Sequence, residues 1–209
     1  MSIIMIISSL LVGYLFGCFQ TSYFISRLVL KKDIRNLGSG NAGASNVTSE
    51  LGWKYGIITG LLDLLKAYIP TQFIIYIYPN TQFPIELMVL AGTGSFLGHI
   101  YPFFLNFRGG KGVACYIGML LAIDPIIGIF AIFGIIFLTF ITDYVTIGSL
   151  ALFIVIPIIT YLCGKYSNLV IMCTCIILVI GLIKHWINIK RIYKGEEVGL
   201  KSVLNKRNN

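Results

Sequence analysis

Three polar, glycine-rich stretches interrupt an otherwise apolar chain, and each has the composition of a phosphate-binding segment. The first stretch alternates glycines with hydroxyl and amide side chains: Gly38, Ser39, Gly40, Asn41, Gly43, Ser45 and Asn46. Glycine permits positive φ, which lets successive backbone amides converge on one anion. The stretch therefore predicts an anion-binding nest, and the alternative is a flexible surface loop.

The second stretch, residues 98–112, adds positive charge. Arg108 and Lys111 stand among three glycines, which are Gly109, Gly110 and Gly112. This is not a Walker P-loop, because the glycine spacing and the terminal Ser or Thr are missing. A lysine and backbone amides in front of a helix N-terminus can nevertheless bind phosphate oxygens. The alternative is a pair of cations that only fixes membrane topology. His99 is either a site residue or a cap of the preceding span.

The third stretch, residues 184–197, should continue a helix. Four polar side chains would then share one helix face, namely Lys184, His185, Asn188 and Arg191. A histidine beside an amide can position a hydroxyl or take its proton near neutral pH. A lone His185 would more often be structural, and Asn188 makes the functional interpretation stronger. A carboxylate that follows, such as Glu197, is expected to hold this cationic segment in place.

The composition indicates the elements that must position these residues. Of 209 residues, 57% are hydrophobic and 11% are charged, with a mean hydropathy of +0.88, which excludes an ordinary soluble domain. Because open sheet edges are excluded from lipid, we expect an all-α polytopic membrane protein. Residues 1–209 are predicted to form one integral membrane domain, with polar motif loops at about 31–54, 98–112 and 184–197. The net charge of +8 lies beside spans and favours a membrane surface over nucleic acid.

Hydrophobic runs predict seven transmembrane helices, at residues 3–30, 55–78, 85–97, 113–123, 125–141, 145–163 and 169–183. The fourth is too short to cross alone, so it borrows residues from the second stretch or is re-entrant. Loss of the fourth and fifth crossings would leave five spans. The apolar start indicates a first span and not a cleaved signal peptide. Alternation places the three stretches on one face, and their cations make that face cytoplasmic, with the N-terminus outside and the C-terminus cytoplasmic.

Two charges lie inside the second predicted span, where each costs about 2.5 to 3.5 kcal/mol. Asp63 and Lys66 are three positions apart and can pair on a helix, and direct contact with a substrate is the alternative. The spacing of Cys173 and Cys175 suits neither a zinc site nor a redox motif, and the five cysteines are expected to be small buried side chains. No metal site and no cofactor is predicted.

The three stretches resemble the signature motifs of the bacterial acyl-phosphate:glycerol-3-phosphate acyltransferases, the PlsY family. The resemblance runs through residues 38–47, 98–115 and 185–197 and covers nearly the whole chain, and Asp63 and Lys66 match a further family pair. It implies a multi-pass enzyme of the bacterial inner membrane, active on the cytoplasmic face. Its substrates would be acyl phosphate and glycerol 3-phosphate, and its products lysophosphatidic acid for phospholipid biosynthesis and phosphate.

The resemblance also implies the roles of individual residues. Ser39 with its loop, Lys111 with its glycines, and His185 with Asn188 would form the site, while Glu197 would support it. An acyl phosphate is already activated, so positioning and oxyanion stabilisation should supply most of the rate. The general base is either His185 or a phosphate oxygen of a substrate, whose second pKa lies near neutrality.

The chain departs from the family pattern at two positions. Ser49 and Asp143 stand where the family usually has arginine, and Arg35 or Lys54 is the expected substitute. One alternative function is therefore a divergent, weakly active paralogue that could associate with a true acyltransferase. Another is a membrane transporter or sensor of an anionic phosphorylated metabolite, although polar groups gathered on one face argue against transport.

Overall fold

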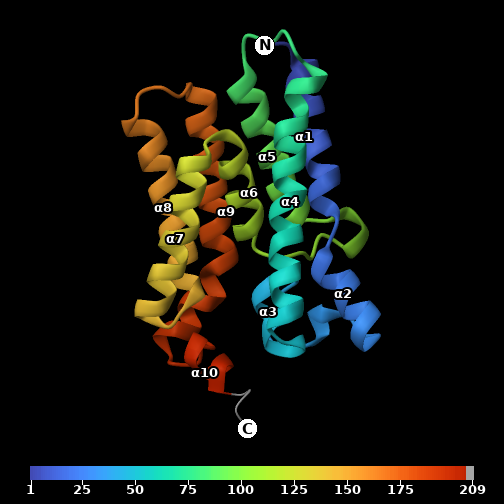
Figure 1. Ribbon diagram of the computed structural model, residues 1–209, viewed down its shortest axis with the longest axis vertical. Helices are drawn as coiled ribbons and strands as arrows, with labels where there is room; N and C mark the ends of the chain where they lie inside the picture. Colours follow the sequence, from blue (N-terminus) through green and yellow to red (C-terminus); the bar gives the residue numbers. More distant parts are fainter. Residues whose placement is uncertain (206–209) are drawn as a thin grey trace. The chain divides into compact units, whose positions relative to one another are not determined.

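The computed structural model describes residues 1–205, and every regular element among them is a helix (Figure 1). The α-helices are α1 (Ile3–Cys18), α2 (Thr21–Leu30), α3 (Ala44–Leu51), α4 (Trp53–Ile77), α5 (Pro84–Ile100), α6 (Val113–Ile123), α7 (Pro125–Thr142), α8 (Val145–Leu162), α9 (Asn168–Tyr193) and α10 (Leu200–Asn205). Two 3-10 turns complete them, η1 (Ile34–Asn36) and η2 (Phe103–Leu105). The prediction of an all-α chain is confirmed for this part. The chain divides into unit 1, Met1–Gly128, and unit 2, from Ile129 onward.

Six helical segments of the described residues are long and apolar enough to cross a membrane. They are Ile3–Leu30, Trp53–Ile77, Pro84–Leu105, Pro125–Thr142, Val145–Leu162 and Asn168–Tyr193. The remaining apolar helix, α6, has 11 residues, which at about 1.5 Å per residue falls short of a hydrocarbon core about 30 Å thick. A seventh crossing and the side that each terminus faces therefore stay predictions.

The first span is broken where a continuous helix was expected. Phe19 and Gln20 separate α1 from α2, and Phe19 has extended backbone angles. The main-chain oxygen of Phe19 accepts a hydrogen bond from Lys66 Nζ at 2.6 Å, and Gln20 Nε2 donates to the carbonyl oxygen of His99 at 2.9 Å. Irregular backbone within a span is tolerated where hydrogen bonds to other parts of the protein satisfy its polar groups, as these two bonds do.

Helices α1 and α5 pack backbone to backbone through reciprocal glycines. Gly13 and Gly17 lie one turn apart on α1, and Gly94 and Gly98 do so on α5. A methyl group at any of the four would overlap main-chain atoms of the opposite helix. Ser95 Oγ also donates to the carbonyl oxygen of Gly13 at 3.1 Å. Small residues spaced by four allow this close approach, which drives helix association in lipid.

All three of the predicted loops are partly helical. Residues 44–51 form α3, because Val47 on its inner face packs with Ile34 and Ala42 in a small core, and Gly52 with φ +92° ends the helix. Helix α5 extends to Ile100, because Gly98 still packs against α1. Helix α9 runs to Tyr193, so most of the third stretch prolongs the last span as predicted.

Unit 2 contains most of α7 with α8, α9 and α10. Gly148 of α8 lies against the main chain of Ile135 in α7, and Gly181 of α9 lies against the ring of Phe153 in α8. These close contacts bring the cytoplasm-facing end predicted for α9 into a defined register with α8. The register sets which α8 side chains can reach the third stretch.

Candidate active site

The first stretch is a loop held by one buried amide. Asn46, which is 3% exposed, accepts a hydrogen bond from the backbone amide of Ser39 at 2.9 Å. Its Nδ2 donates to the carbonyl oxygens of Ile34 at 3.2 Å and Leu37 at 3.0 Å. The amide of Gly40 also donates to Leu37 O, at 2.9 Å. Two amides of the predicted nest are therefore used inside the loop, and Asn46 builds the loop.

Positive φ occurs in this loop at two glycines. Gly38 has φ +52° and Gly40 has φ +76°, whereas Gly43 is extended with φ −139° and begins α3. The Ser39 side chain between the two left-handed glycines is exposed, and Asn41 is partly exposed. The loop thus presents these two side chains outward as candidate ligands for an anion.

The glycines of the second stretch serve close approach to the end of α5. The amide of Gly109 donates to Ile100 O at 3.0 Å, and that of Gly110 donates to His99 O at 3.1 Å. A methyl group at Gly109 would overlap His99 O, and one at Gly110 would overlap the His99 imidazole. Of the three glycines only Gly112 has positive φ, at +86°. Lys111 and the start of α6 therefore remain the best candidates for phosphate, because two amides of the expected cradle are already bonded.

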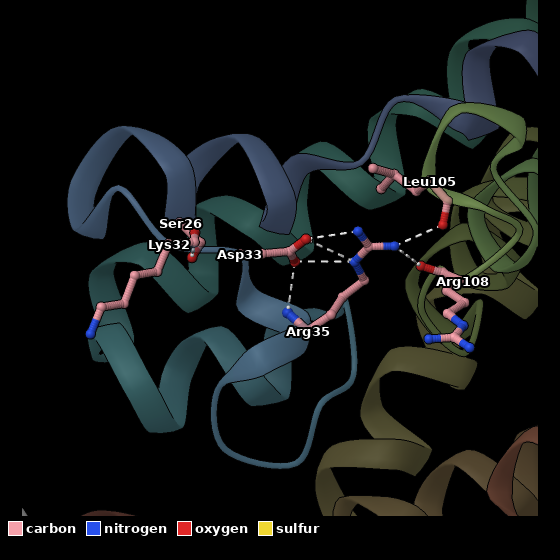
Figure 2. A network of polar contacts seen from close by, with 6 residues as sticks. All are labelled: Ser26, Lys32, Asp33, Arg35, Leu105 and Arg108. Atoms are coloured by element: carbon pink, nitrogen blue, oxygen red, sulfur yellow. Dashed lines mark hydrogen bonds and ion pairs between the residues drawn. The ribbon is translucent and has the colours of Figure 1, made fainter.

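The first and second stretches meet within unit 1. A methyl group at Gly110 would lie 2.8 Å from the carbonyl oxygen of Ala42, in the first stretch. Arg35 adds a second connection, since its Nη1 donates to Leu105 O at 2.7 Å and to Arg108 O at 3.5 Å. Figure 2 shows this guanidinium between the Asp33 carboxylate and the two carbonyl groups.

Asp33 fixes the orientation of Arg35. The Nη2 and Oδ2 atoms are 2.7 Å apart, and Nε donates to Oδ1 at 3.1 Å. Hydrogen bonding to this guanidinium holds the pKa of the Asp33 carboxyl below its ordinary value, and the same bond raises the pKa of Arg35. The guanidinium already donates to a carboxylate and two carbonyls. The hypothesis that Arg35 replaces a phosphate-binding arginine is therefore disfavoured, and exposed Lys54 remains the candidate.

A buried polar cluster lies beneath this junction. Lys66 Nζ is 2.8 Å from Asp63 Oδ1, 2.6 Å from Phe19 O and 2.9 Å from His99 Nδ1. Thr21 Oγ1 donates to the same Asp63 oxygen at 3.0 Å. Asp63, Lys66 and His99 are each at most 6% exposed. An ammonium group only donates, so His99 Nδ1 accepts, and all three Lys66 protons have acceptors.

The structure bears on two questions that the sequence leaves open, the partner of the charges at Asp63 and Lys66 and the place of His99. Asp63 and Lys66 pair with each other, which is how their charges are neutralised in the span. His99 links several elements, because its ring lies beside Gly110 while its carbonyl oxygen accepts from Gln20 and Gly110. Its position at the junction makes it a support of both stretches.

The third stretch, in unit 2, centres on a carboxylate. Glu197 Oε1 accepts from Asn188 Nδ2 at 2.6 Å and from Thr146 Oγ1 at 2.8 Å. His185 is 2% exposed, and its Nδ1 lies 2.8 Å from the carbonyl oxygen of Gly181. Because a carbonyl only accepts, the proton of a neutral His185 is on Nδ1, and Nε2 is the basic nitrogen. Its ring lies 5.6 Å from that of Phe153.

Three residues organise these groups in ways that the sequence does not predict. Arg35 joins the first two stretches, His99 supports their junction, and Thr146 donates to Glu197. Arg35 and Leu105 are 70 positions apart, and Thr146 and Glu197 are 51 apart. No local pattern signals contacts of this range.

Comparison with known proteins identifies the family. The family model described as glycerol-3-phosphate acyltransferase matches residues 7–195. The glycerol-3-phosphate acyltransferase of Staphylococcus saprophyticus is 36% identical over 204 residues, which are 94% of this chain and 98% of that protein. The Staphylococcus aureus enzyme of the same name (strain Newman) is 36% identical over 203 residues, with the same coverage.

Solved structures agree with the sequence relatives. The crystal structure of PlsY, an integral membrane glycerol 3-phosphate acyltransferase, is similar in its glycerol 3-phosphate form, with a TM-score of 0.84 and 32% identity over 93% of this chain and 95% of that one. Its lysophosphatidic acid form gives a TM-score of 0.79 and 32% identity over 95% of this chain and 98% of that one. The match of the family model to residues 7–195 and the similarity to these relatives confirm the resemblance: this chain belongs to the glycerol-3-phosphate acyltransferase family.

Proposed function

We propose that this protein transfers a fatty acyl group from acyl phosphate to the 1-hydroxyl of glycerol 3-phosphate, producing lysophosphatidic acid and inorganic phosphate. Family membership supports the reaction class. The observation that carries the proposal is the junction in unit 1, where Gly110 of the second stretch fits against Ala42 of the first. That junction places two donor-bearing loops side by side, as a reaction between two phosphate-bearing molecules requires.

The exposed Ser39, the partly exposed Asn41 and Lys111 are the proposed phosphate ligands, with Arg108 as an outer cation. A lysine and a helix N-terminus bind phosphate oxygens well, because both present positive charge and donors. Asn188, oriented by Glu197, and His185 are proposed to position the attacking hydroxyl.

The reaction needs no protein nucleophile. The 1-hydroxyl oxygen of glycerol 3-phosphate attacks the carbonyl carbon of acyl phosphate, an ester C–O bond forms, and the bond to the phosphate oxygen breaks. Phosphate leaves with the bonding electron pair. The hydroxyl proton passes to His185 Nε2 or to a phosphate oxygen of a substrate. Positioned donors act on the developing oxyanion, which is usually the largest contribution to such a rate.

The membrane arrangement forms part of the proposal. Seven crossings in a bacterial inner membrane, with the N-terminus outside, would put all three stretches at the cytoplasmic face. The many lysines and arginines near these stretches support that orientation. Helix α6 would cross together with residues of the second stretch.

Phosphate release by the purified protein in detergent, with acyl phosphate and glycerol 3-phosphate, tests the proposal. Release should depend on both substrates. Lys111→Ala and Asn188→Ala should each lower kcat/KM by at least about a hundredfold, as loss of a group that binds reacting atoms does. Lys165→Ala, which removes a lysine next to Tyr166 in another loop, is the matched control and should retain activity. Full activity in both site variants would refute the assignment.

Ser49 and Asp143 favour a second candidate, a paralogue with weak activity, because each replaces a cation expected from the family pattern. Genetic rescue separates the two. Restored growth of a bacterial strain that lacks its acyl-phosphate-dependent acyltransferase supports full activity, and absent rescue with measurable phosphate release in vitro supports the weak paralogue.

A further inference from the structure

Asp143 occupies a left-handed turn between α7 and α8, with φ +70°. Aspartate tolerates this conformation better than most residues do. Its carbonyl oxygen accepts a hydrogen bond from the amide of Leu200 at 2.7 Å, and its Oδ1 accepts one from the amide of Lys201 at 2.7 Å. Asp143 therefore binds the first two residues of α10 with a main-chain and a side-chain oxygen. We call this pair of bonds the tail clasp.

The residue before α10 fits the tail clasp closely. Gly199 is buried, and a methyl group there would overlap Oδ2 of Asp143. Only glycine leaves room for the carboxylate at this distance. The bond from Lys201 has an ionised acceptor, and such bonds are shorter and stronger than bonds between neutral groups.

A second set of bonds holds the other end of the same segment. At the end of α9, Gly195 has φ +71° and its amide donates to Ile192 O at 3.0 Å, while the amide of Glu196 donates to Arg191 O at 2.8 Å. This pattern stops a helix and fixes the direction of the chain that follows. Glu197 thus lies in a short segment that is anchored at both ends.

We propose that Asp143 is a positioning residue that acts through Glu197 on Asn188. Glu197 is the acceptor that orients the Asn188 amide, and it can do so only while its own backbone is held near α8. Release of the tail clasp frees one end of the segment, and the carboxylate then spends less time at Asn188. The consequence for turnover rests on the proposed function of Asn188.

Substitutions of Asp143 separate the carboxylate from the backbone. Asp143→Gly keeps the left-handed backbone but removes the side-chain acceptor, whereas Asp143→Asn keeps an acceptor oxygen. We expect Asp143→Gly to lower kcat about tenfold, the effect of losing roughly one charge-assisted hydrogen bond, without changing KM for acyl phosphate. Asp143→Asn should keep kcat within about threefold of that of the unmodified protein.

A matched control lies at the opposite end of α7. Asp124 Oδ1 accepts from the amides of Ile126 at 3.1 Å and Ile127 at 3.3 Å, so Asp124→Ala also removes a capping carboxylate. It should lower thermal stability without lowering kcat. An equal loss of kcat in Asp124→Ala and Asp143→Gly would show that general stability is responsible, and would overturn the proposal.

A double variant tests the order of action. If Asp143 acts through Glu197, then Asp143→Gly combined with Glu197→Ala should be no slower than Glu197→Ala alone. If the losses of kcat from Asp143→Gly and Glu197→Ala multiply in the double variant, the proposal is overturned. Hydrogen exchange of the Leu200 and Lys201 amides gives a readout without turnover, and should accelerate at least about tenfold in Asp143→Gly.

The exchange and activity measurements also separate the two proposals. Unchanged exchange in Asp143→Gly refutes the tail clasp whatever the activity. Absent turnover in the unmodified protein refutes the proposed function. In that case the side-chain amide resonance of Asn188 decides the positioning role, because it should shift in Asp143→Gly and stay unchanged in Asp124→Ala.

Discussion

The first and second stretches, in unit 1, are joined mainly through main-chain groups, whereas in unit 2 a carboxylate, that of Glu197, orients Asn188. In unit 1, Asn46 and Arg35 donate to carbonyl oxygens, and Gly109 and Gly110 lie directly against the end of α5. In unit 2, Asn188 projects from the continuous helix α9 and is oriented by the side chain of Glu197. The two regions therefore depend on different properties of their residues.

The difference indicates what each region tolerates. A backbone junction leaves no room for added volume, because interiors are close-packed and a single methylene is felt. A side-chain bond is lost by deleting one acceptor or donor, without moving the backbone. At the loop junction of unit 1, substitutions that add atoms should therefore be damaging, whereas removal of one polar atom should be sufficient to release Asn188 in unit 2.

The largest effect is expected at the buried charge pair of unit 1. Asp63→Ala leaves the Lys66 ammonium without its carboxylate at 2.8 Å, in a position 6% exposed. Removing one partner of a buried pair typically costs about 3 to 5 kcal/mol of unfolding free energy. Thermal unfolding in detergent measures the loss. The pair Asp63→Leu with Lys66→Met should recover at least half of it, and a double variant as unstable as the single one would contradict this account.

The next effect is steric. Gly110→Ala adds a methyl group that overlaps the His99 ring, and we expect a loss of about 1 to 3 kcal/mol together with reduced phosphate release. Gly134→Ala is the matched control in α7, because a methyl group there meets no atom within 4 Å. The control should be neutral or slightly stabilising, since alanine favours a helix over glycine. Equal unfolding temperatures for the two variants would argue against a tight junction.

A smaller effect is expected in unit 2. Thr146→Val removes the hydroxyl that donates to Glu197 at 2.8 Å, and kcat should fall about fivefold, which corresponds to about 1 kcal/mol for one hydrogen bond. Thr160→Val, on the same helix, breaks a hydroxyl contact of 3.3 Å with Thr174 and is the control. Thr146→Ser should restore the rate. Equal rates for Thr146→Val and the unmodified protein would show that Glu197 needs no help from α8.

The smallest effect is a dependence of stability on pH. The lowered pKa of Asp33 means that its contribution is complete above the ordinary pKa of 3.8 and is lost as pH falls through the lower folded pKa. Asp33→Asn lacks this carboxylate, so this part of the pH dependence of its unfolding free energy should be absent between pH 3 and pH 6. At pH 6 its unfolding free energy should be lower than that of the unmodified protein by about 1 kcal/mol. Unfolding curves at several pH values measure it. Parallel curves for the two proteins would contradict the ion pair with Arg35.

Local pattern was enough to predict much of the fold. Apolar length and composition indicated the spans, and the spacing of Asp63 and Lys66 allowed their pairing as one of two alternatives, because both depend on neighbouring residues of one helix. The break at Phe19 depends on Lys66, 47 positions away, and no local pattern contains that information. The same holds for Asp143, whose carboxylate binds an amide 58 positions later.

The candidate site was predictable in residue type more than in role. Asn46 and the glycines of the second stretch were expected to face a ligand, and the structure uses them to build loops. Glycine amides and asparagine side chains can form hydrogen bonds with a ligand or within a loop. Composition therefore does not distinguish a ligand-binding residue from one that builds the loop. Exposure distinguishes them, and exposure depends on which distant segment packs against the loop.

The glycine contact between α1 and α5 has a consequence for biogenesis. Ser95 and its acceptor Gly13 are 82 positions apart, so α1 enters the bilayer well before its partner has been synthesised. Until then lipid must cover the furrow of small residues on α1. A bulky side chain at Gly13 or Gly17 would therefore leave the membrane insertion of α1 intact and prevent its later packing against α5.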